Sequence, residues 1–130
     1  LLIALACGIV IDTLLIVNNY RDIDNDRRAG KKTLIVRIGK ENGLRLYLVA
    51  GIVGAAIVAI SLLMMFPLWL SLISIVLLVP YLLLHISTYK DMAIIGEGRE
   101  LNKTLGKTAR NMFVFGLSTA IANVLCSTLI

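Results

Sequence analysis

The longest stretch without a formal charge constrains the fold of this chain more than any other feature. Between Arg45 and Lys90, 44 consecutive residues contain no Asp, Glu, Lys or Arg. A single helix of that length would extend about 66 Å, roughly twice the thickness of the hydrocarbon core of a bilayer. The stretch must therefore fold back on itself. The sequence Phe66-Pro67-Leu68 marks the turn, because proline begins a helix more readily than it continues one.

Two further apolar stretches flank this pair, at about residues 1–17 and 111–130. Hydrophobic residues make up 58% of the chain and charged residues only 16%, whereas ordinary soluble domains carry about 25% charged residues. We therefore predict an all-α, multi-span transmembrane helix bundle rather than a soluble helical core. The expected spans are about residues 1–20, 46–66, 68–89 and 110–130, and the expected polar loops are residues 21–45 and 90–109.

The basic residues indicate how the bundle is oriented. All 13 Lys and Arg residues lie within or at the edge of the two polar loops. Two spans separate these loops, so both loops must lie on the same side of the lipid bilayer. The positive-inside rule makes that side cytoplasmic. Topology then explains most of the net charge of +5, and no nucleic-acid partner is expected.

Topology does not explain the acidic residues at the end of the first span, in the segment NNYRDIDNDRRAGKK (residues 18–32). Asn18, Asp22 and Asp26 recur at intervals of four residues, so they would share one face if the helix continues past the membrane. Two carboxylates on one face repel each other unless a cation neutralises them. Mg²⁺ is typically held by one or two carboxylates together with water and substrate phosphates. The pattern predicts a Mg²⁺ site formed by Asp22, Asp26 and Asn18, and a solvated helix end is the alternative.

Basic residues beside these acids favour an anionic ligand. Arg21, Lys31 and Lys32 flank the carboxylates. Carboxylates for a metal next to cations for an anion suggest a phosphate group that the metal bridges. Asp24 lies on the opposite helical face, and we interpret it as a solvated charge.

Two ionisable residues lie within the expected spans. Asp12 precedes Asn19 by seven residues, on nearly the same helical face. We expect its side chain to face the interior of the bundle, either as a functional group or in a structural hydrogen bond. His85 stands alone and is interpreted as a packing residue. Pro80 is expected to kink its helix.

The second polar loop contains further candidates. Asn102, Lys103 and Thr108 could form a lid over the substrates, and a plain connector is the alternative. In the second span, Gly51 and Gly54 are expected to allow close packing of helices.

The segment NNYRDIDNDRRAGKKTLIVRIG (residues 18–39) closely resembles the second aspartate-rich motif of the UbiA-type intramembrane prenyltransferases. Its pattern N-x2-R-D-x3-D-x3-GK-x-T-L is most similar to the members that prenylate 1,4-dihydroxy-2-naphthoate in menaquinone biosynthesis. The segment LNKTLGKTARNMFVFG (residues 101–116) resembles the last cytoplasmic loop and final span of the same enzymes. The resemblance implies the C-terminal part of one transmembrane prenyltransferase domain, without the first aspartate-rich motif of the family.

The resemblance also implies a function. The enzyme would sit in a bacterial inner membrane and use Mg²⁺ to transfer a polyprenyl group from polyprenyl diphosphate to 1,4-dihydroxy-2-naphthoate, with loss of the carboxylate. Asp22, Asp26 and Arg21 would be the catalytic residues. The diphosphate would be bound by Arg21, Lys31 and Lys32. The N-terminal half of the same enzyme would complete the site. A UbiA-type enzyme with another aromatic acceptor and a cation-binding transporter fragment are the alternatives.

Overall fold

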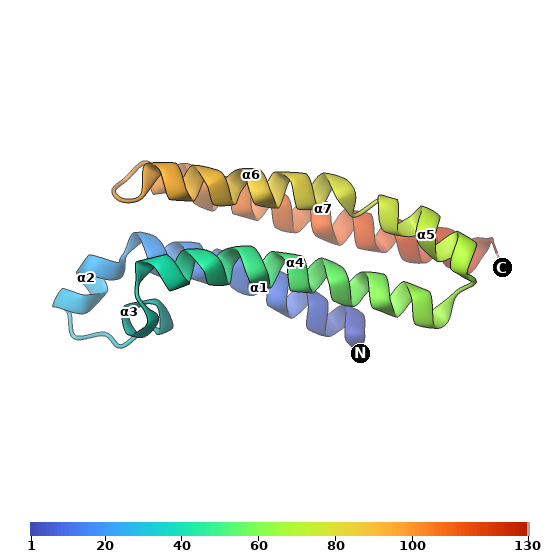
Figure 1. Cartoon of the computed structure of the whole chain (residues 1–130), viewed down its shortest axis with the longest axis horizontal. Coiled ribbons are helices and arrows are strands. Elements are labelled where there is room, and N and C mark those ends of the chain that lie inside the picture. The colour runs from blue at the N-terminus through green and yellow to red at the C-terminus, as the bar shows by residue number, and fades with distance from the viewer. Residues whose placement is uncertain (130) are drawn as a thin grey trace.

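The computed structural model describes residues 1–129, and over that range it contains α-helices and no β-strand. The helices are α1 (Leu2–Arg21), α2 (Ile23–Arg28), α3 (Leu34–Ile38), α4 (Lys40–Met65), α5 (Leu68–Val76), α6 (Val79–Ile95) and α7 (Leu101–Thr128). The long rods of the bundle are α1, α4, the consecutive pair α5 and α6, and α7 (Figure 1). The short helices α2 and α3 lie together at one end.

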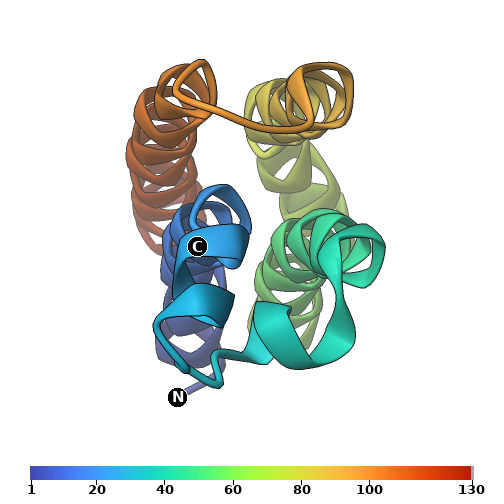
Figure 2. The same cartoon turned by 90° about the vertical axis from the view of Figure 1, so that its left-hand side faces the viewer.

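The rods stand at the corners of a square when the bundle is viewed from the end that carries α2 and α3 (Figure 2). Helix α1 packs against α4 and α7, and α6 packs against the same two helices. Contact between α1 and α7 therefore closes the bundle between the first and last helices of the chain. This contact matters for the site, because it brings the two polar connections to one another.

Three helices are long and apolar enough to span a membrane, namely α1, α4 and α7. Helices α5 and α6 meet the same test together, with a bend of 40° between them. The expected third span is thus interrupted at Leu77 and Leu78, and Pro80 follows as the second residue of α6. The proline ring clashes with the preceding turn of a continuing helix and removes a hydrogen-bond donor. The multi-span bundle and the effect of Pro80 are both confirmed.

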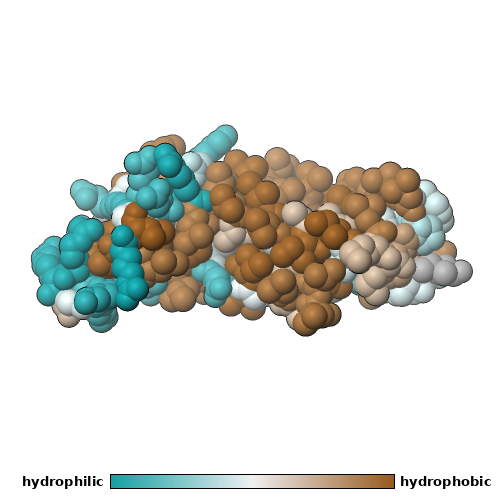
Figure 3. Space-filling view, turned by 60° about the horizontal axis from the view of Figure 1, so that its bottom comes forward, coloured by the Kyte–Doolittle hydropathy of each residue, from teal (hydrophilic) through white to brown (hydrophobic). Residues whose placement is uncertain are grey.

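The two polar connections lie at the same end of the bundle. Helices α2 and α3 and the loop of residues 96–100 are at one end, whereas the turn at Phe66 and Pro67 is at the other (Figure 1). The surface shows the same division, with hydrophilic residues gathered at the first end and hydrophobic residues over most of the remaining length (Figure 3). This arrangement is the one that the distribution of basic residues predicts.

Two helices extend beyond the expected limits of the spans. Helix α4 begins at Lys40 rather than near residue 46, and α7 begins at Leu101 rather than near residue 110. The irregular connection between α6 and α7 is therefore reduced to residues 96–100. Charged residues indicate where a span leaves the membrane. The helix itself can continue beyond that point, because its backbone hydrogen bonds do not depend on the membrane.

Close helix packing depends on two glycines of α4. A Cβ atom at Gly51 would lie 2.1 Å from Nε2 of His85, and one at Gly54 would lie 2.4 Å from Cγ2 of Val10. The expectation that both glycines allow close packing is confirmed. His85 is buried and stacks on the ring of Tyr47, with 4.6 Å between the ring centroids. It serves as a packing residue, as predicted.

Asp12 does not face the interior of the bundle that residues 1–129 form, in contrast to the expectation from the sequence. The buried face of α1 runs through Ala6, Val10, Thr13 and Val17, which are spaced three or four residues apart. Asp12 lies off this face and is exposed. Spacing from Asn19 shows which residues share a side of the helix, but the neighbouring helices decide which side is buried.

Candidate functional site

The candidate site forms where α1 ends. Helix α1 stops at Arg21, and Asp22 separates it from the short helix α2. The backbone keeps its helical hydrogen bonds across the break, from Asp22 N to Asn18 O at 3.1 Å and from Asp26 N to Asp22 O at 2.8 Å. Asp24 and Asp26 then lie in the first turn of α2, where the helix dipole favours negative charge. Asn18, Asp22 and Asp26, called the acidic ladder below, are therefore linked by backbone hydrogen bonds even though the helix breaks at Asp22.

The guanidinium group of Arg21 is the centre of the site. Its Nε and Nη2 atoms donate to the two carboxylate oxygens of Asp22, both at 2.7 Å. Nη2 also donates to Oδ1 of Asn18, and Nη1 donates to Oδ1 of Asn102, each at 2.8 Å. Bidentate binding of a carboxylate is a geometry that arginine provides and lysine does not. Because Asn102 belongs to the first turn of α7, this one side chain joins the two polar connections.

The contact with Arg21 also stabilises the ionised form of Asp22. The hydrogen bond from the guanidinium lowers the pKa of Asp22 below its usual value. Burial opposes this effect, and the positive charges of Arg21 and Lys31 add to it. Asp22 is therefore ionised at neutral pH.

Asp26 has a different partner. It is buried, and its carboxylate lies 3.3 Å from Nζ of Lys31, whose side chain is exposed. The chain turns back between them at Gly30, whose φ of +71° favours glycine. Asp24, by contrast, is exposed and lies 3.6 Å from Arg27, in the position of a solvated charge. Each of the two ladder carboxylates thus has its own basic partner.

A hollow of about 340 Å³ opens beside Arg21. It is lined by residues from both polar connections, namely Arg21, Asp22, Asn25, Gly98, Arg99 and Asn102. Two arginines can bind an anion, and the carboxylate and amide oxygens can bind a cation. Sequence patterns identify Asn102 as a candidate but not Arg99 or Asn25, because only the fold brings the two connections together.

The remaining candidates occupy different places. Lys103 is exposed and forms an ion pair with Glu100. Thr108 is buried, and its Oγ1 lies 2.9 Å from the hydroxyl of Tyr47. The structure therefore places Thr108 in the core of the bundle rather than in a lid. Lys32 is exposed in the connection between α2 and α3.

The oxygen donors of the site suit a hard divalent cation that arrives with its own ligands. Among residues 1–129, no three His, Cys, Asp or Glu side chains lie close enough to share a metal ion. Mg²⁺, however, usually takes only one or two carboxylates and completes its octahedral shell with water and phosphate oxygens. Asp22, Asp26 and the amide oxygen of Asn18 match this donor chemistry. Of these three residues, Asp22 lines the hollow beside Arg21, whereas Asp26 and Asn18 lie outside its lining.

Apolar helices of this length, with charged residues gathered at one end, define an integral membrane protein. The profile of the UbiA prenyltransferase family matches residues 1–93. The chain belongs to the UbiA prenyltransferase family. The match includes Arg21 and both ladder aspartates but ends before α7, so the resemblance of residues 101–116 to the family stays a prediction.

Two curated relatives are similar to parts of the chain. The 1,4-dihydroxy-2-naphthoate octaprenyltransferase of Escherichia coli (strain K12) is 40% identical over 81 residues, which cover 58% of this chain and 26% of that protein. The protein of the same name from Haemophilus influenzae is 45% identical over 40 residues, which cover 31% of this chain and 13% of that protein. The chain therefore matches about a quarter of the length of the first relative. No solved structure is significantly similar to the chain.

Proposed function

We propose that this chain is part of an enzyme that transfers a polyprenyl group from polyprenyl diphosphate to 1,4-dihydroxy-2-naphthoate in menaquinone biosynthesis. Family membership supports prenyl transfer, and the names of the two relatives support this acceptor. The observation that carries the proposal is the group of Arg21, Asp22, Asn18 and Asn102, which forms a site of mixed charge at one end of an apolar bundle. Such a site suits a donor with a charged head and a long apolar tail.

Mg²⁺ is the proposed cofactor. Bound between protein and diphosphate, it would supply positive charge to the leaving group. Asp22 and Asp26 would hold it through carboxylate oxygens, and Asn18 would hold it through its amide oxygen. Because Asp22 is ionised at neutral pH, no proton has to leave this carboxylate before the metal binds.

The basic residues would bind the diphosphate. Four of the five N–H groups of Arg21 already donate to Asp22 and to two asparagines. The fifth, on Nη1, has no partner among residues 1–129 and can donate to a phosphate oxygen. Donors held in a fixed plane need little reorganisation when negative charge develops on the leaving group. The exposed side chains of Lys31 and Lys32 would neutralise the remaining phosphate oxygens.

The transfer breaks the bond between the first prenyl carbon and the diphosphate oxygen, and the electron pair leaves with the diphosphate. The allylic cation is then attacked by the ring carbon that carries the carboxylate. Loss of this carboxylate as CO2 returns its bonding pair to the ring, which becomes aromatic again. The product is a demethylmenaquinone in its quinol form.

The same arrangement favours a site on the cytoplasmic side of a bacterial inner membrane. Both polar connections carry basic residues and lie at one end of the bundle. Loops rich in Lys and Arg stay on the cytoplasmic side. The isoprenoid tail would lie against the apolar helices at membrane depth, and the soluble ring would enter from water.

The experiment that tests the proposal uses the full-length enzyme containing this segment, in membranes with Mg²⁺ and a polyprenyl diphosphate. Given 1,4-dihydroxy-2-naphthoate, it should release CO2 and form a prenylated naphthoquinol that mass spectrometry detects. Product formed with 4-hydroxybenzoate alone would reassign the acceptor. A folded protein that prenylates neither acceptor would contradict the proposal.

A further inference from the structure

Asp12 lies near the middle of α1 and is the only charged residue of that helix before Arg21 at its end. Its side chain is exposed and forms no hydrogen bond or ion pair with any of residues 1–129. Asp22 follows ten residues further on, so Asp12 lies about 15 Å from the charged site along the helix axis. A carboxylate at this depth is neither part of the site nor at the membrane surface.

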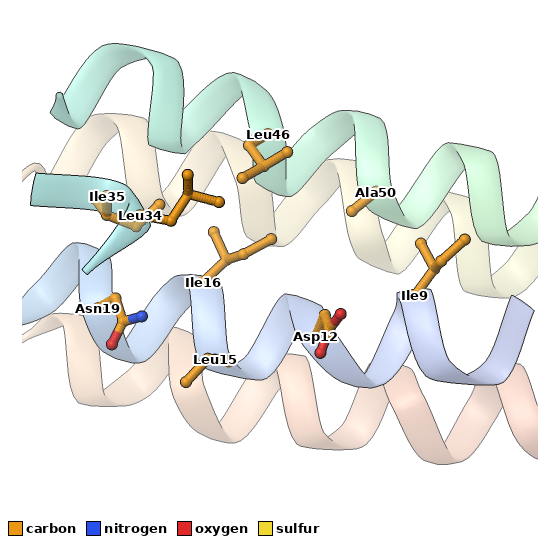
Figure 4. Close-up of a pocket in the computed structure, with 9 residues that line it drawn as sticks. All are labelled: Ile9, Asp12, Leu15, Ile16, Asn19, Leu34, Ile35, Leu46 and Ala50. Atoms are coloured by element: carbon orange, nitrogen blue, oxygen red, sulfur yellow. The ribbon is translucent and has the colours of Figure 1, made fainter. Parts of the chain in front are cut away.

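Helix α1 forms a ridge between two hollows, and Asp12 borders both of them. The first hollow, of about 310 Å³, lies between α1, α3 and α4, and its polar residues are Asp12 and Asn19 (Figure 4). The second, of about 440 Å³, lies on the other flank of α1, next to α7. Leu15 also borders both hollows. The surface formed by Ile11, Asp12, Leu15 and Asn19 is called the Asp12 ridge below.

We propose that another transmembrane helix of the full-length protein packs on the Asp12 ridge and donates a hydrogen bond to the carboxylate of Asp12. Ionisable residues at membrane depth are costly in lipid and almost always face a bundle interior or a polar partner. Ile11 and Leu15 are 55% and 57% exposed beside Asp12, and they supply apolar surface for the contact. The donor would be Asn, Gln, Ser, Thr or a basic side chain, the residues that form hydrogen bonds between membrane helices.

Two other occupants of the ridge are disfavoured. The acceptor ring has to come within about 3–3.5 Å of the prenyl carbon next to the diphosphate, whereas Asp12 lies about 15 Å deeper. A second copy packed on the ridge about a twofold axis would bring two Asp12 carboxylates toward each other, and like charges repel. The matched stretch is only 26% of the E. coli relative, so proteins of this kind contain further chain that can supply the helix.

Photo-crosslinking in the full-length protein tests what covers the ridge. A benzophenone amino acid replaces Leu15 or, as a matched control, Leu83, which is 64% exposed on α6. The probe at Leu15 should crosslink to a peptide outside residues 1–130 of the same molecule, and mass spectrometry identifies that peptide. The control should react with lipid. Crosslinks from the ridge to lipid alone, or to a second copy of the protein, would overturn the proposal.

Replacing Asp12 by leucine should change the Tm in opposite directions, depending on whether another helix or lipid covers the Asp12 ridge. If a donor on another helix faces Asp12, Asp12→Leu leaves this donor unpaired and lowers the Tm of the solubilised full-length protein. Asp12→Asn still accepts a hydrogen bond and should change the Tm less. If the ridge faces lipid, Asp12→Leu removes a carboxylate from hydrocarbon and raises the Tm. A Tm that rises or stays constant in Asp12→Leu refutes the proposal.

The crosslinked peptide also identifies the candidate donor, which permits a double-mutant cycle. Removing the donor alone should lower the Tm, and removing it in the Asp12→Leu background should have little further effect. Additive losses would show that the two groups do not contact each other. None of these measurements involves prenyl transfer, so they separate this inference from the proposed substrate and reaction.

Discussion

Replacing Arg21 by lysine in the full-length enzyme keeps the positive charge but exchanges a planar fork for a single ammonium group. Arg21 makes two hydrogen bonds to Asp22 and one each to Asn18 and Asn102. A lysine nitrogen carries its three donors at one point, so it cannot reach acceptors on both sides of the guanidinium at once. We expect Arg21→Lys to lose at least two of these hydrogen bonds, including the contact to α7.

The expected loss follows from the exposure of the groups. Two hydrogen bonds to charged groups contribute about 3–6 kcal/mol when they are well buried. The side chains of Arg21 and Asp22 are 26% and 32% exposed, and fully exposed ion pairs contribute only about 0.2–1 kcal/mol. We therefore expect the free energy of unfolding to fall by about 1–2 kcal/mol. Turnover should fall by about 10²-fold, the usual effect of losing one donor to a developing negative charge.

Arg27→Lys is the matched control. Both partners of the Arg27–Asp24 pair are more than half exposed, and they lie 3.6 Å apart. We expect a change in stability within about 0.5 kcal/mol and a change in turnover within about twofold. Thermal unfolding in detergent measures the first quantity, and prenyl transfer with quantified product measures the second. Equal losses of turnover in the two variants would refute the assignment of Arg21 as the centre of the site.

Asp22→Asn and Asp26→Asn should each lower turnover at least about 10²-fold, and raising the Mg²⁺ concentration should partly restore it. Asp24→Asn should change turnover by less than about tenfold. Equal activity of the three variants would show that the acids only form a solvated helix end. Folding lowers the pKa of Asp22 from 3.8, so its stabilising effect is fully present above that value and is lost as the pH falls through the lower folded pKa. The free energy of unfolding should therefore drop less between about pH 7 and pH 3 in Asp22→Asn than in the unchanged protein. Gly51→Ala should lower the free energy of unfolding by about 1–3 kcal/mol, because the new methyl group would lie 2.1 Å from a ring nitrogen of the buried histidine. At Gly106 an added Cβ has no atom within 4 Å, so Gly106→Ala should be neutral or should stabilise the protein by up to about 1 kcal/mol. Similar melting curves for the two glycine variants would contradict the packing argument.

The limits of the helices were only partly predictable from the sequence. The turn at Phe66 and Pro67 follows from a charge-free run too long for one span, and the structure has it there. The start of α4 at Lys40 lies outside the expected span of residues 46–66, because a helix can continue past the membrane surface into the polar loop. A helix satisfies its own backbone hydrogen bonds in water as well as in lipid, so a change in polarity does not end it.

The candidate site was predictable as a segment but not as an arrangement. The ladder of Asn18, Asp22 and Asp26 is local, and a spacing of four residues is enough to recognise it. The separate partners of the two carboxylates are not implied by that spacing. They depend on the break at Asp22 and on the turn at Gly30, whose backbone conformations appear only in the folded chain.

Three features follow from composition along the chain, namely the all-α membrane bundle, the location of both polar connections at one end and the segment that carries the acids. The contact of Arg21 with Asn102, 81 residues away, depends instead on how the helices pack. The packing also places Asp12 on the outer surface of the bundle that residues 1–129 form. The physical reason is the same in both cases. Helical periodicity states which residues share a face, but only the packing of α1 against α4 and α7 determines what each face meets.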